Sequence, residues 1–70
     1  MTDREWVEAF ARELGTEPPG DAEFAELLEL AGVAAHASQR TAAPVSCWLA
    51  ARAGLTPREA LERARALAGT

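Results

Sequence analysis

The feature that most constrains the fold of this chain is a helix-start signal that begins at Thr56. Thr56 can accept a hydrogen bond from the backbone N–H of Glu59, and the Glu59 carboxylate can accept one from the N–H of Thr56. Pro57 suits the first helical position, where its missing N–H leaves no helical bond unmade. Thr2 and Glu5 repeat this spacing near the start of the chain. Two such signals in seventy residues predict short helices with well-defined ends.

Glycine, aspartate and proline residues indicate where the remaining helices begin or end. Gly15 and Gly54 suit the left-handed conformation that often terminates a helix. Asp21 is a good N-cap, and Pro44 fits the first turn of a helix. No segment shows the pattern of a strand. The sequence therefore predicts a single all-α domain over residues 1–70, a small four-helix bundle with helices at about 3–14, 22–38, 44–53 and 57–68.

Each predicted helix carries an apolar stripe at helical spacing. Gly32 interrupts the second stripe, and glycine costs about 1 kcal/mol relative to alanine in a helix. We therefore expect a close backbone contact at Gly32. In chain order, the residues expected to be buried are Trp6, Phe10 and Leu14; Phe24, Leu27, Leu28, Ala31, Ala34 and Ala35; Val45, Trp48 and Leu49; and Ala60, Leu61, Ala64, Leu67 and Ala68.

Charge is distributed unevenly along the chain. Residues 1–29 hold nine acids and two arginines, and residues 30–70 hold two acids and five arginines, which gives −7 and +3 within a net charge of −4. This dipolar distribution favours head-to-tail or antiparallel pairing of the two halves, within one chain or between chains. The net negative charge and the absence of lysine argue against a nucleic-acid partner.

Several features bear on where the protein works. No window approaches the roughly 20 apolar residues of a membrane span, and the first residues lack the layout of a secretory signal. The single cysteine, Cys47, cannot form an intramolecular disulfide. We therefore expect a cytoplasmic protein that does not bind membranes. The chain lacks Lys, Asn, Ile and Tyr, whose codons are AT-rich, which indicates a GC-rich bacterial genome.

No catalytic constellation is recognisable. The chain has no Gly-rich phosphate loop, and one histidine with one cysteine cannot make a structural zinc site within one chain. Cys47 lies in an apolar segment, which favours a buried structural thiol over a nucleophile. We predict no enzymatic activity, no cofactor and no metal.

The segment that joins the second and third predicted helices contains polar residues with no evident structural role. His36 and Arg40 are four residues apart, so on a continuing helix they would share a face. The N–H groups of the following helix would attract an anion, so His36, Arg40, Thr41 and Ser46 are a candidate site for phosphate, carboxylate or a nucleotide tail. Alternatively, His36 and Arg40 complement the carbonyl end of the second helix.

Trp6 and Trp48 each have two interpretations. Their apolar helical neighbours favour core packing. In so small a domain, one of them can instead remain partly exposed and anchor a partner.

A helix-turn-helix is a weaker interpretation of residues 46–65. Gly54 fits the turn, and Thr56 with Pro57 would open a recognition helix. Ala60 and Arg63, however, stand where that motif has bulky apolar residues. We therefore do not expect a DNA-binding role.

Taken together, the chain resembles a short actinobacterial-type domain family of unknown function that occurs beside or fused to molybdenum-cofactor guanylyltransferases. The distinctive part is the spacing of His36, Arg40 and Ala43-Pro44, and Cys47-Trp48 departs from the usual Thr-Phe. The resemblance implies a genomic link to molybdopterin metabolism and gives added weight to His36 and Arg40. The other matching segments are Trp6-Val7, Glu13-Leu14-Gly15, Leu27-Leu28-Glu29-Leu30-Ala31, Ala35-His36, Pro44-Val45 and Trp48-Leu49.

Two hypotheses for function follow. The first is an accessory interaction module that docks on a protein partner, such as a molybdenum-cofactor enzyme, or associates with itself. The second is a domain that binds a small anionic ligand through His36 and Arg40.

Overall fold

Four helices make up the fold seen in a computed structural model that describes residues 1–69. The prediction of a small all-α four-helix bundle is confirmed, and residues 1–69 contain no strand. The observed helix ends agree with the predicted ones to within two residues. The helices are α1 (Asp3–Leu14), α2 (Asp21–Ala37), α3 (Ala42–Arg52) and α4 (Pro57–Ala68).

Local capping explains where α1 and α4 begin. The Thr2 hydroxyl accepts a hydrogen bond from the N–H of Glu5, while the Glu5 carboxylate accepts one from the N–H of Thr2. Thr56 and Glu59 form the same reciprocal pair at the start of α4. Both predicted capping boxes are therefore confirmed. Gly15 ends α1 at φ +72°, the left-handed conformation that glycine adopts without strain.

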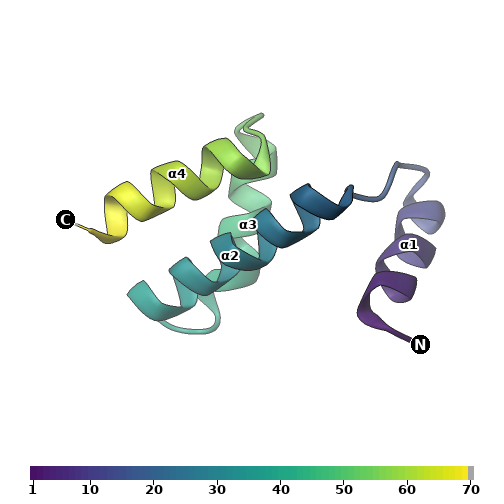
Figure 1. Ribbon diagram of the computed structural model, residues 1–70, viewed down its shortest axis with the longest axis horizontal. Coiled ribbons are helices and arrows are strands. Elements are labelled where there is room, and N and C mark those ends of the chain that lie inside the picture. The colour runs from purple at the N-terminus through teal and green to yellow at the C-terminus, as the bar shows by residue number, and fades with distance from the viewer. Residues whose placement is uncertain (70) are drawn as a thin grey trace.

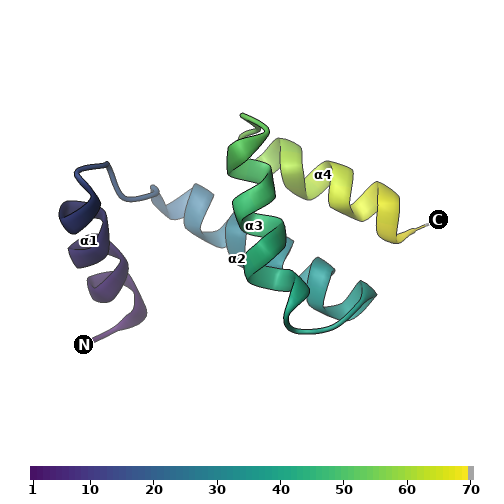
Figure 2. The same cartoon turned by 180° about the vertical axis from the view of Figure 1, so that it is seen from behind.

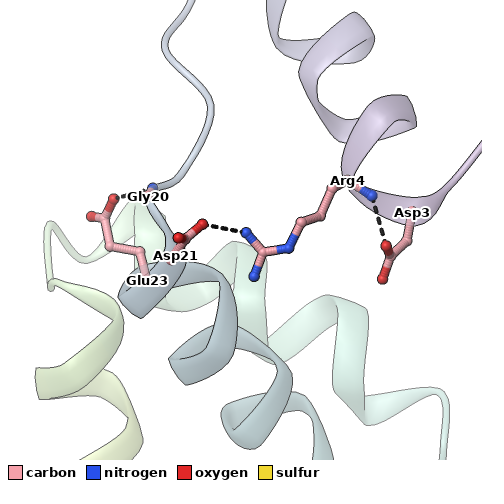
Figure 3. A network of polar contacts seen from close by, with 5 residues as sticks. All are labelled: Asp3, Arg4, Gly20, Asp21 and Glu23. Atoms are coloured by element: carbon pink, nitrogen blue, oxygen red, sulfur yellow. Dashed lines mark hydrogen bonds and ion pairs between the residues drawn. The ribbon is translucent and has the colours of Figure 1, made fainter.

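The start of α2 differs from the prediction. Gly20, not Asp21, is the N-cap residue, and its backbone N–H donates to the Glu23 carboxylate (Figure 3). Asp21 is already helical, and its carboxylate pairs with the Arg4 guanidinium of α1. A carboxylate in the first turn is still favourable, because it faces the positive end of the helix dipole.

The helices are not packed equally. Figure 1 shows α2 in the middle, with α3 and α4 gathered around it, and Figure 2 shows the same group from behind. The backbone of α1 packs closely against none of the other three helices, and α1 lies beyond the N-terminal end of α2. The molecule is consequently elongated, 38 Å by 23 Å by 18 Å.

The centre of the core is small and lies between α2 and α4. Leu30 of α2 is 3% exposed, and Ala60 and Leu61 of α4 are each 5% exposed. Alanine at this contact lets the two helix axes approach closely. The partly buried side chains that pack against this cluster are Val33, Cys47, Ala50, Leu55 and Ala64.

Several residues expected in the core are exposed instead. On α1, Trp6, Phe10 and Leu14 are 55%, 46% and 61% exposed, because no other helix covers their stripe. On α2 the predicted stripe is wrong only at Leu28, which is 60% exposed, and it omits Leu30, which is buried. The other predicted residues of this helix are partly buried: Phe24, Leu27, Ala31, Ala34 and Ala35. The remaining core predictions that are wrong concern Val45, Trp48, Leu49, Leu67 and Ala68, which are all exposed.

The expectation of a close contact at Gly32 is also wrong. A Cβ atom placed on Gly32 would meet nothing within 4 Å outside its own helix backbone. Gly32 therefore lowers the stability of α2 relative to alanine, and no close packing at this position offsets that loss.

Candidate functional site

The first candidate surface is the apolar face of α1, which we define as Trp6, Phe10 and Leu14. The Trp6 and Phe10 rings stack with their centroids 5.0 Å apart and their planes 30° apart. About half of each side chain is accessible. The α1 face therefore presents a preformed aromatic pair rather than scattered single side chains.

Arg4 holds α1 to the start of α2. Its guanidinium pairs with the Asp21 carboxylate (Figure 3). It also lies 4.4 Å from the centroid of the Phe24 ring. Arg4 and Asp21 border a hollow of about 160 Å³ beside Pro18 and Pro19. Because the ion pair is largely exposed, we expect it to orient α1 rather than to add much stability.

The second candidate surface is the outer face of α3, which we define as Val45, Trp48, Leu49 and Arg52. The three apolar side chains are between 54% and 57% exposed. The Arg52 guanidinium lies 5.0 Å from the centroid of the Trp48 ring, a cation–π arrangement that keeps both groups in place. These residues are spaced i, i+3, i+4 and i+7, so they form one continuous stripe along the helix.

The inner face of α3 explains why its large side chains point outwards. Ala43, Ser46, Cys47 and Ala50 have the same helical spacing, and all four are partly buried. Small side chains on this face allow α3 to lie close to α2, where the Cys47 thiol donates to the Leu27 carbonyl at 4.0 Å. Burial raises the pKa of the Cys47 thiol, which favours its protonated form.

A mostly apolar hollow lies between α2, α3 and α4. Its volume is about 450 Å³, and its walls include Leu30, Val33, Ala64 and Leu67. Ser46 is one of its few polar lining residues. The hollow could take an apolar group, but it offers little to orient a charged one.

The four residues of the predicted anion site do not line a single hollow. Ser46 borders the apolar cavity, whereas His36 borders a separate, shallow hollow of about 480 Å³ together with Arg65 and Gly32. The helix ends at Ala37, so Arg40 is not on a continuation of the His36 face.

Of the two residues in the capping interpretation, only His36 lies within the last turn of α2. Arg65 lies in the last turn of α4, where it pairs with Glu29. Both basic residues, His36 and Arg65, thus lie near the negative ends of helix dipoles. Thr41 is the N-cap residue of α3, and its side chain makes no capping hydrogen bond. The assignment of His36, Arg40, Thr41 and Ser46 to an anion site stays a prediction.

Residues 1–69 contain neither a metal-binding cluster nor a membrane-spanning helix. In this part of the chain no three His, Cys, Asp or Glu side chains gather closely enough to hold a metal ion. None of its helices has the length and apolar character needed to span a bilayer.

Comparison with known families identifies the domain. A family model described as a domain of unknown function, DUF6457, matches residues 2–70. The chain belongs to this family. The match carries no indication of an association with molybdenum-cofactor guanylyltransferases. Neither the curated proteins nor the solved structures that were compared with the chain include a match.

Sequence reasoning identified Trp6 and Trp48 as possible anchors and found the apolar stripes to which they belong, but it expected both stripes to be buried. A signal for the α3 face was present, because Ala43, Ser46, Cys47 and Ala50 form a stripe of small residues opposite the bulky one. For the α1 face the sequence offered no comparable signal, since its stripe has the composition of a normal buried face.

Proposed function

We propose that this domain is a protein-interaction module that acts by binding, not by catalysis. The observation that carries the proposal is the exposure of two apolar helix faces, each centred on a tryptophan that is more than half accessible. Soluble monomers rarely expose contiguous apolar surface of this kind unless it meets a partner.

The composition of both faces supports the proposal. Tryptophan and arginine are the side chains most enriched among the residues that dominate binding energy at protein interfaces. Trp48 and Arg52 are already stacked on the α3 face, and Trp6 is stacked on Phe10 in the α1 face. Side chains that are held in place before binding lose less conformational entropy when a partner docks.

Three finer expectations from the sequence remain predictions. A bacterial origin and a molybdenum-cofactor enzyme as partner rest on composition and resemblance alone. Binding of a small anion by His36 and Arg40 is the alternative function, and the interaction faces carry more structural support than it does.

Photocrosslinking inside cells tests the proposal. A photoreactive p-benzoylphenylalanine would replace Trp6 or Trp48 in the intact protein, and Glu62, exposed on α4, would be the matched control position. We expect a discrete crosslinked species from Trp48 that disappears when Leu49→Glu is added, and none from Glu62. If neither tryptophan position gives more crosslinking than Glu62, to any protein including itself, the proposal is wrong.

A further inference from the structure

We propose that the partner of the α1 face is the α3 face of a second copy of this chain, and that two copies exchange these contacts reciprocally. The inference rests on the proposed function, because it names the occupant of the same two faces. A reciprocal exchange makes a two-fold dimer in which each copy contributes one α1 face and one α3 face.

Charge complementarity favours this pairing. Helix α1 carries four acids, Asp3, Glu5, Glu8 and Glu13, against two arginines. Helix α3 carries no acid, and its only charged residue, Arg52, is part of the exposed face. Contact between the two helices therefore brings an acidic element against a basic one.

Pairing of like faces is disfavoured by the same charges. Two α1 helices in contact would place acidic residues of one copy beside acidic residues of the other. Two α3 faces in contact would place the Arg52 side chains of both copies in one interface. Like charges brought together in this way cost free energy, and that cost discriminates against wrong partners.

The pairing cannot be made within one chain in this arrangement. Arg4 fixes α1 to the start of α2, and α1 packs against neither α3 nor α4. Figures 1 and 2 show α1 beyond the N-terminal end of α2 and apart from α3, which lies against the middle of α2. A second molecule is therefore needed to bring the two faces together.

The accessible area indicates that two contacts are required rather than one. Large side chains have areas of about 150–250 Å², and the six apolar residues of the two faces are roughly half exposed. Covering them buries roughly 600 Å² in one α1–α3 contact, which is the size of a crystal-packing contact. Two reciprocal contacts bury roughly 1,200 Å², which reaches the lower end of the range for specific, stable interfaces.

Sedimentation equilibrium on the intact protein tests the pairing through complementation. The α1-face variant is Trp6→Ala with Phe10→Ala, and the α3-face variant is Trp48→Ala with Leu49→Ala. All four side chains are about half exposed, and circular dichroism would check that both variants keep their helices. Leu28→Ala is the control, because Leu28 is an equally exposed leucine that belongs to neither face.

Reciprocal exchange predicts a distinctive pattern of dissociation constants among these proteins. The wild type and Leu28→Ala should dimerise with the same Kd, and each face variant alone should show a Kd at least about thirtyfold higher, as expected when hot-spot residues are lost. An equimolar mixture of the two variants retains one intact contact, so it should associate more tightly than either variant alone. Added salt should weaken the wild-type dimer.

Three results would overturn the pairing. Self-association that persists in the α3-face variant would assign the dimer to α1 against α1, and persistence in the α1-face variant would assign it to α3 against α3. A wild type that stays monomeric at the highest concentrations would exclude self-pairing. If such a monomer still crosslinks from Trp48 to another protein, the interaction function stands and only the choice of partner is wrong.

Discussion

Replacing Leu30 by alanine is the most direct test of where the core lies. Leu30 is 3% exposed and contacts the Ala60 and Leu61 cluster of α4. The substitution removes three carbon atoms at about 0.8 kcal/mol each and leaves a cavity that adds to the cost. We expect Leu30→Ala to lower the free energy of unfolding by about 3 kcal/mol. The total for a domain of this size is roughly 4–10 kcal/mol, so a large share of the stability would be lost.

Leu28→Ala provides a control that differs only in its place on α2. The same atoms are removed from the same helix, but Leu28 is 60% exposed. The loss of partial burial should cost less than about 1 kcal/mol, and the higher helix propensity of alanine offsets a few tenths of it. Urea unfolding of both variants, followed by circular dichroism at low micromolar concentration, gives the two values side by side.

One result of this comparison would contradict the assignment of the buried face of α2. If Leu28→Ala destabilises the protein as much as Leu30→Ala does, α2 presents a different face to α4 than the structure shows. An unchanged dependence of unfolding on urea concentration in both variants is also needed, because a change in that slope would indicate an altered denatured or native state.

Two further predictions concern the helices alone. Gly32→Ala should raise the free energy of unfolding by about 0.5–1 kcal/mol, because the new Cβ meets nothing within 4 Å; a lower midpoint in urea would show that the glycine is needed. Hydrogen bonds from the backbone N–H and the hydroxyl of Thr56, with the Arg63 charge, hold the pKa of Glu59 below its ordinary value of 4.5. A depressed pKa stabilises the fold above pH 4.5 and ceases to do so as the pH falls through the folded value. Glu59→Gln should therefore melt at a lower temperature than the wild type at pH 7, with the gap closing in acid; a gap independent of pH would refute the charge argument.

Helix positions were predictable from the sequence because they depend on neighbouring residues. The two capping boxes at Thr2 and Thr56 are four-residue motifs, and their hydrogen bonds form regardless of what the helix packs against. The terminating conformation of Gly15 is local in the same sense. The N-cap of α2 differs by one residue from the predicted Asp21, whose side chain bonds Arg4, seventeen residues away in the chain.

The buried faces were less predictable because they depend on the partner helix. Leu28 and Leu30 are chemically identical, and only the position of α4 decides which one is covered. On α3 the usual rule that bulky residues lie inside fails, because close packing against α2 requires the small stripe that contains Cys47 and Ala50. Trp6 and Trp48 could be recognised as candidate anchors, but their exposure could not be derived from residue type.

Because α1 is separate from the other helices, the stability of the protein has two unequal contributions, one from α1 and one from the core of α2, α3 and α4. Residues of α2, α3 and α4 share one core, whereas α1 is joined to them through a short loop and the contacts of Arg4. Such weakly coupled parts open independently of one another, with different free energies. Substitutions in the two parts should have additive effects. The sequence of α1 can therefore change to suit a new partner without lowering the stability of the remaining bundle.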